Sequence, residues 1–263
     1  FGDIRDSMRV EAPSGEGPDI IIGAHDWIGE LVSNGLISPL DLSGLEDNFL
    51  DASLDAFTWE GKTYALPYAI ESIGLVYNKD LVPTPPETWE EFVKVIEENT
   101  NEEEEKYGFA MPQPDPFHTY PFFTALGGYV FKTNEDGTYD TNDIGLNNEG
   151  AVEGIKMLDE LYEEQAPYVD SQTMTSLFTS GDLAMMVTGP WSFSSLDAVD
   201  MNYGFAPFPK MKGQRPEPFS SVHGFMISAF SENKMLAQAF IRDFIATEEV
   251  MTQLFEEGTR PPA

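Results

Sequence analysis

A short apolar run of the sequence ends in three residues that could bind a ligand. Residues 17–27 read GPDIIIGAHDW, in which Ile20–Ile22 have the composition of a buried strand and His25, Asp26 and Trp27 follow closely. The loops after strand ends are the part of an open α/β sheet that packing leaves uncovered, and ligands bind there. A histidine, a carboxylate and a large aromatic ring at such a place predict a binding site.

Two more carboxylates could belong to the same chemistry. Glu71 lies between Ile70 and Ser72, and Asp115 precedes Pro116 and an aromatic run. Paired carboxylates, Asp26 with Glu71 or Glu71 with Asp115, could act as acid and nucleophile or base in a glycoside hydrolase, provided that their separation is right. Asp26 also has a structural interpretation, because it could cap the N-terminus of the helix that follows it.

Other enzyme classes lack their motifs. The chain contains no G-x-S-x-G elbow, no H-E-x-x-H pair and no P-loop, which argues against a serine hydrolase, a zinc protease and an NTPase. The three histidines lie far apart along the chain, and His25 with Asp26 lacks the spacing of metal ligands. We therefore expect neither a metal site nor a cofactor.

Charge excludes several partners. The 263 residues include 46 acidic and 14 basic side chains, which gives a net charge of −32. Such a field repels phosphate backbones and anionic membrane surfaces, so we expect no nucleic acid partner. A solvated acidic surface suited to high salt is favoured over an acidic binding patch.

The absence of cysteine excludes disulfides and thiolate metal sites.

Strands and helices are predicted to alternate along the chain. The expected strands lie at 20–22, 73–77, 107–111, 183–187, 205 and 226–229, with a hairpin at 57–64. The expected helices begin near Asp26, Thr88, Pro116, Asn147 or Asn148, Met174 and Gly189, and the last covers 235–255 with a break near Thr247. This alternation predicts an α/β fold.

Four motifs carry a resemblance to a known family. In chain order they are GPDIIIGAHDW, LVYNKDL at 75–81, GGYVFK at 127–132 and TGPW at 188–191. Their order and spacing closely resemble those of the maltose/maltodextrin-binding proteins of bacterial ABC importers, and the thermophilic maltotriose-binding members in particular. The resemblance covers essentially the whole chain.

The resemblance implies a periplasmic-binding-protein-like fold with two lobes, a ligand cleft and several hinge crossings. Residues 1–68 and 226–263 would form the first lobe, 73–219 the second, and 69–72 and 220–225 the crossings. It also implies a protein outside the cytoplasm, free in the periplasm or held as a cell-surface lipoprotein. Such a protein delivers maltodextrin to the permease subunits of an ABC transporter and is not an enzyme.

The family comparison also implies that segments are missing at both ends of this chain. We expect their absence to leave apolar faces uncovered on the strands that begin at Ile20 and Met226, and to favour self-association.

The chemistry of a sugar matches the residue types. A sugar ring carries hydroxyls around its rim and apolar C–H groups on its faces, so its site needs carboxylates or amides at the edge and flat aromatic rings. The resemblance implies that Asp26, Glu71 and Asp115 accept hydrogen bonds from hydroxyls. It implies that Phe117 and Trp191 stack on sugar faces. The remaining candidates are His25, Trp27, Tyr68, His118 and Tyr120.

Several of these candidates have an ordinary structural interpretation. Trp191 could be a core aromatic and His118 a core or helix-surface histidine. Two positions also depart from the better-known enteric protein, which has a tryptophan where Gly23 stands and an arginine where Trp27 stands. The two departures together suggest that an aromatic ring has moved across the site.

Overall fold

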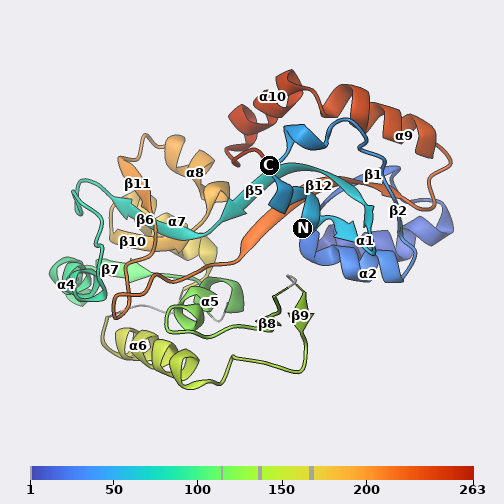
Figure 1. Ribbon diagram of the computed structural model, residues 1–263. Coiled ribbons are helices and arrows are strands. Elements are labelled where there is room, and N and C mark those ends of the chain that lie inside the picture. The colour runs from blue at the N-terminus through green and yellow to red at the C-terminus, as the bar shows by residue number, and fades with distance from the viewer. Residues whose placement is uncertain (1, 114, 136–137, 166–168) are drawn as a thin grey trace. The chain divides into compact units, whose positions relative to one another are not determined.

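The chain divides into two compact units in a computed structural model that describes residues 2–113, 115–135, 138–165 and 169–263 (Figure 1). Unit 1 comprises Phe1–Glu71 with Ser220–Ala263, and unit 2 comprises Ser72–Phe219. The chain therefore passes between the units at the bonds 71–72 and 219–220. The first bond lies within the predicted crossing 69–72, and the second lies at the start of the predicted crossing 220–225.

Unit 1 is built on a sheet whose middle strand is β12 (Ser220–Ser228). Antiparallel to it run β1 (Ile20–Ala24) and β2 (Ile37–Ser38), and β5 (Ala65–Ser72) also pairs with it. The register with β1 runs from Ile20 opposite Ile227 to Ala24 opposite His223. Residues 223–225, part of a predicted crossing, are thus paired within the sheet of unit 1.

Helices cover both faces of this sheet (Figure 1). They are α1 (Gly2–Glu11), α2 (Ile28–Ser33), α3 (Asp51–Ala56), α9 (Lys234–Phe240) and α10 (Glu248–Gly258), with a π-helical turn at Ile241–Ile245 and 3₁₀ turns at Ala12–Ser14, His25–Trp27 and Glu46–Asn48. Met8 and Leu31 belong to the core on the α1 and α2 side, and Ala237 and Ile241 to the core on the other side.

The predicted hairpin is confirmed. Strand β3 (Thr58–Trp59) pairs with β4 (Lys62–Thr63). Glu60 and Gly61 between them have φ angles of 49° and 74°. Positive φ at both central residues is the type I′ geometry, which matches the twist of a two-residue hairpin.

Unit 2 is built on a mixed sheet in the order β11 (Tyr203–Ala206), β6 (Gly74–Asn78), β10 (Leu183–Thr188) and β7 (Tyr107–Ala110). Its central strand β10 is buried along its whole length, as expected for an apolar run with helices on both faces. It runs antiparallel to β6 and parallel to β7. A short hairpin, β8 (Lys132–Thr133) with β9 (Tyr139–Asp140), lies apart from this sheet.

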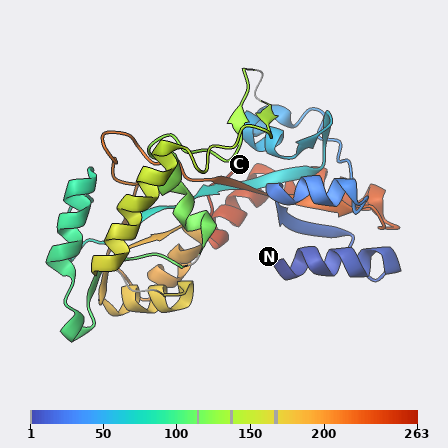
Figure 2. The same ribbon diagram turned by 90° about the horizontal axis from the view of Figure 1, so that it is seen from below.

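The unit 2 helices also pack on both faces of their sheet. They are α4 (Trp89–Asn99), α5 (Pro116–Thr124), α6 (Glu149–Gln165), α7 (Ser171–Ser180) and α8 (Phe193–Asp197), with 3₁₀ turns at Glu102–Glu104 and Pro190–Ser192. Figure 2 shows α4 in teal and α6 in yellow side by side. Phe92 and Leu158 pack on one face of the sheet, and Met174 and Leu196 on the other.

The helix starts follow the capping chemistry that the sequence predicts. Thr88 and Glu91 form a capping box, and Asn148 accepts from the backbone N–H of Ala151. Thr247 caps α10 and so confirms the predicted break. Helices α1 and α3 were not predicted, and the π-helical turn is a local departure from α-helical geometry within the predicted helix 235–255.

The expectation of uncovered strands is wrong. Met226 and Ile227 are fully buried in the sheet of unit 1, and Ile21 is buried in β1. Exposed apolar side chains of unit 1 lie instead on its helices, for example Val10 of α1 at 75%, Met235 of α9 at 90% and Phe244 of the π-helical turn at 61%. Among the described residues, none of the helices combines the length and the apolar character that crossing a bilayer requires.

The capping box gives a test of local stability. The Oγ1 of Thr88 accepts from the Glu91 N–H at 3.2 Å, and Glu91 Oε2 accepts from the Thr88 N–H at 3.3 Å. Thr88→Ala should lower the free energy of unfolding by about 1 kcal/mol, because the first turn of α4 loses its cap. Urea unfolding measures this, with exposed Thr84→Ala as the control. Equal losses in both variants would contradict a capping role.

Candidate functional site

Asp26 lies on the surface at the end of strand β1. His25–Trp27 form a 3₁₀ turn directly after the strand, and α2 begins at Ile28. The N-cap of α2 is Trp27, and no side chain caps this helix. The interpretation of Asp26 as a helix cap is therefore wrong. Its exposed carboxylate stands at a strand end, which is the geometry expected of a ligand contact.

Trp27 packs within unit 1, and its ring lies over Gly23. Only 6% of Trp27 is exposed, and Arg5 stands 5.9 Å from the centre of its ring. A Cβ atom added at Gly23 would come within 2.6 Å of Trp27 Cε3. The ring at position 27 thus fills the space beside position 23, which a larger residue at position 23 would need.

His25 and His223 lie close together, although the sequence separates them widely. Ala24 pairs with His223 across the sheet, and the backbone N–H of Val222 donates to His25 Nδ1 at 3.2 Å. The fold therefore brings together two histidines that are far apart along the chain. Within the described part of the chain, no group of three or more His, Cys, Asp or Glu residues is arranged to hold a metal ion.

The pKa of the His25 side chain is lowered mainly by burial. Burial brings this pKa below its ordinary value of 6.5, while the neighbouring Asp26 carboxylate opposes the shift and His223 adds to it. The neutral form is thereby favoured, in keeping with an Nδ1 that accepts a hydrogen bond.

Glu71 is a buried carboxylate with two protein partners. It is 6% exposed, and it is the last residue of unit 1 on β5. His223 Nε2 donates to Glu71 Oε1 at 2.8 Å, and Arg260 Nε donates to Glu71 Oε2 at 2.8 Å. Neither His223 nor Arg260 was among the predicted site residues, because nothing in the sequence pairs them with position 71.

Tyr68 is half-buried on the same strand as Glu71. Its ring centre lies 5.3 Å from that of Phe225 and 6.4 Å from that of His223, and burial raises the pKa of its phenol. Tyr68 also lines a groove beside α10 together with Leu254 and Arg260. It therefore lies next to the Glu71 cluster on the side that α10 covers.

Asp115 and His118 form a pair at the start of α5 in unit 2. Asp115 Oδ1 accepts from the Phe117 N–H at 2.8 Å, which caps the helix, and its Oδ2 lies 2.7 Å from His118 Nδ1. Since a carboxylate only accepts, His118 donates from Nδ1. His118 is buried, and its ring meets that of Trp191 edge to face.

Trp191 is half-buried, and its ring lies over a glycine as that of Trp27 does. A Cβ atom added at Gly189 would collide with the Trp191 ring, 2.5 Å from Cη2. The side chains of Thr188 and Ser192 are hydrogen-bonded at 2.6 Å and fix the 3₁₀ turn that carries the tryptophan. Only glycine at position 189 allows this close approach.

Four half-buried or exposed rings form an aromatic group in unit 2, composed of Phe117, Tyr120, Trp191 and Phe219. Phe219 stacks on Tyr120 with ring centres 3.7 Å apart and planes 9° apart, and it lies nearly parallel to Phe117 at 6.1 Å. The ring centre of Trp191 lies 6.3 Å from that of Phe117, with the two planes tilted by 48°. Phe219, 37% exposed, was not predicted because it lies in a stretch without helical or strand periodicity.

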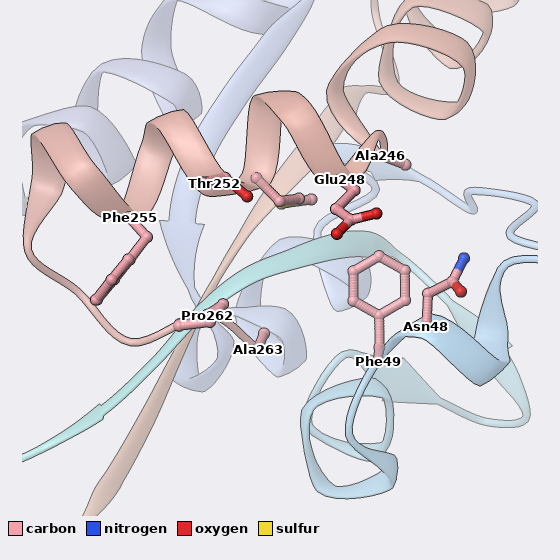
Figure 3. A pocket seen from close by; sticks show the side chains of 9 residues that line it. Asn48, Phe49, Ala246, Glu248, Thr252, Phe255, Pro262 and Ala263 are labelled. Carbon is pink, nitrogen blue, oxygen red and sulfur yellow. The ribbon is translucent and has the colours of Figure 1, made fainter.

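The predicted residues thus gather in two sets. In unit 1, His25 and Asp26 follow β1, and His223, which pairs with Ala24 of that strand, joins them to Glu71. In unit 2, Asp115 contacts Phe117 and His118, and the rings of Phe117 and His118 lie beside that of Trp191. A separate cavity of 560 Å³ in unit 1 lies between α10 and the segment around Phe49. Figure 3 shows Glu248 and Phe49 pointing toward one another there. Its lining contains none of the predicted residues.

The lowered pKa of His25 predicts a pH dependence of stability. The unfolded chain takes up the histidine proton at a higher pH than the folded chain, so stability is lost as the pH falls below about 6.5. His25→Asn keeps an acceptor for the Val222 N–H and removes the titration.

Melting temperatures near pH 7.5 and pH 5.5 should therefore differ less for His25→Asn than for the wild-type chain. The same pair of measurements in concentrated KCl controls for the acidic surface, whose repulsion the salt screens. An identical pH dependence in both proteins would show that His25 does not titrate on unfolding.

Comparison with known proteins gives consistent similarities. A maltotriose-binding protein of Pyrococcus abyssi is 34% identical over 260 residues, which cover 96% of this chain and 56% of that protein. A galactooligosaccharide-binding protein of Bacillus subtilis is 32% identical, covering 98% of this chain and 63% of its own length. The chain thus spans between about half and two thirds of the relatives that it matches.

The fold comparison agrees with these relatives. A crystal structure of a cyclo/maltodextrin-binding protein complexed with maltotetraose matches with a TM-score of 0.85 and 34% identity, over 99% of this chain and 68% of that one. This match confirms the predicted α/β, periplasmic-binding-protein-like fold class. The family model of bacterial extracellular solute-binding proteins matches residues 1–263. The chain therefore belongs to the bacterial extracellular solute-binding protein family.

Proposed function

We propose that the protein to which this chain belongs captures maltodextrins outside the cytoplasm. The observation that carries the proposal is the fold match to a maltodextrin-binding protein solved with maltotetraose, at 34% identity over 99% of this chain. The maltotriose-binding relative supports the same sugar class. The galactooligosaccharide-binding relative makes a galactose-containing oligosaccharide the natural competitor in any test.

The residue chemistry of both units supports this ligand. Asp26 and Glu71 offer carboxylate acceptors for hydroxyls, as does Asp115 through the lone pairs that its cap and His118 leave over. Phe117 and Trp191 offer partly exposed aromatic faces for the apolar side of a sugar. The proposal gives Trp27 no sugar contact, because its ring packs within unit 1.

The proposed role is binding and delivery, without catalysis, metal or cofactor. The sugar would pass to the permease subunits of an ABC importer in the membrane, in keeping with the names of the Streptococcus pneumoniae relatives, which are maltooligosaccharide ABC transporter solute-binding lipoproteins. Both the extracytoplasmic place and the permease partner belong to the proposal.

A sugar panel tests the function directly. Maltotriose should raise the melting temperature of the chain, by an amount equivalent to about 2.7 kcal/mol at a hundredfold excess over the dissociation constant. Cellobiose, a β-linked glucose disaccharide, should give no rise. A rise with a galactooligosaccharide alone would replace the proposed sugar class, and no rise with any sugar would contradict the function.

The same samples separate binding from hydrolysis. Maltotriose recovered after long incubation should be intact, because the proposal assigns no acid and nucleophile pair. Shorter sugars in the recovered sample would favour the glycoside hydrolase alternative.

Trp191 gives the sharpest test of the site. Trp191→Ala should weaken maltotriose binding by about 1.5 to 3 kcal/mol, the value of burying one large apolar side chain, and titration calorimetry measures the change. The control is Trp59→Ala, which removes a partly exposed tryptophan of the β3–β4 hairpin. A large loss of stability, about 3 to 5 kcal/mol, with normal affinity would instead identify Trp191 as a core residue.

A further inference from the structure

Three segments that are distant in the sequence meet at the Glu71 carboxylate in unit 1. Glu71 is on β5, His223 is on β12, and Arg260 follows α10. The last segment is also tied to β5 through its backbone, since the Ile70 N–H donates to the Pro261 carbonyl at 3.0 Å. The cluster therefore lies where β5 and β12 meet the C-terminal segment, next to the bonds at which the chain leaves unit 1.

The cluster is buried, which makes each partner costly to lose. The side chains of Glu71 and His223 are 4% and 7% exposed. A buried carboxylate without a partner loses its hydration and has nothing to replace it, so it needs donors or a cation beside it. Arg260 supplies the cation, and His223 supplies a second donor.

The two donors leave acceptor capacity on Glu71. A carboxylate has about four lone-pair sites on its two oxygens, and within the described part of the chain each Glu71 oxygen accepts one hydrogen bond. One site on each oxygen remains for a hydroxyl group. Because both oxygens are held by their donors, the remaining lone pairs have a fixed direction before any ligand arrives, which lowers the entropy cost of binding.

We propose that Arg260 and His223 are positioning residues that hold the Glu71 carboxylate as a preorganised acceptor for sugar hydroxyls. The proposal rests on the proposed sugar-binding function and adds two residues that do not themselves touch the sugar. Arg260 acts through its charge and its Nε–H, while His223 fixes the other oxygen.

A double-mutant cycle on the whole 263-residue chain tests the proposal, with the dissociation constant for maltotriose as the readout. Glu71→Gln and Arg260→Met should each weaken binding about tenfold or more. In the Glu71→Gln background, Arg260→Met should cause little further loss, because its effect passes through Glu71. Arg260→Lys keeps the cation and should restore part of the affinity.

The matched control is Arg242→Met. Arg242 is another half-buried arginine of unit 1, and it donates to the carbonyls of Asp41 and Ser43 instead of to Glu71. Its loss should lower the melting temperature and leave the dissociation constant unchanged. If the role of Arg260 were purely structural, Arg260→Met would likewise lower the melting temperature and leave the dissociation constant unchanged.

The outcomes separate this inference from the function itself. If the wild-type chain binds maltotriose and folded Arg260→Met binds it equally well, the positioning role is overturned and the function stands. An equal effect of Arg260→Met with and without Glu71→Gln also overturns it. If Arg260→Met does not fold, the cycle is measured with Arg260→Lys, and additivity there overturns the inference. Failure of the wild-type chain to bind any sugar overturns the proposed function.

Discussion

An almost fully buried carboxylate needs hydrogen-bond donors or a positive charge beside it. In unit 1 this requirement of Glu71 joins three chain segments. One partner comes from β12 and the other from the segment after α10, so the charge pairs are also the contacts between those segments. Removing one partner of such a pair costs more than the pair contributes, because it leaves a buried charge uncompensated. The local geometry at the end of β5 therefore depends on electrostatics as well as on apolar packing.

The two units share a packing arrangement in which a tryptophan ring lies over a glycine at a strand end. Gly23 lies within β1 and Trp27 in the turn that follows it, while Gly189 follows β10 and Trp191 lies in the next turn. In both places a Cβ atom would collide with the ring. The consequences differ, since Trp27 is buried in the core of unit 1 whereas Trp191 keeps part of its ring exposed beside Phe117.

Local chemistry could be predicted from the sequence, and long-range pairing could not. The Thr88 capping box, the I′ hairpin at Glu60–Gly61 and the apolar strand β10 depend on residues within a few positions of each other. The partners of Glu71 are 152 and 189 residues away, and sequence periodicity carries no information on such contacts. Helix α1 shows the same limit, because its ion pairs join Arg5 and Arg9 to Glu30 of α2, and nothing local in the sequence indicates this pairing.

The three carboxylates implied by the family resemblance are not equivalent. Asp115 is committed to its helix cap and to His118, Glu71 to His223 and Arg260, and Asp26 alone is exposed without a capping bond. A hydroxyl that approaches Asp26 competes mainly with water, so its net gain is modest. A hydroxyl that approaches Glu71 meets an acceptor whose direction is already fixed, and an analogue lacking that hydroxyl leaves a buried lone pair unused. Under the proposed function, discrimination between sugars should therefore depend more on the buried carboxylate than on the exposed one.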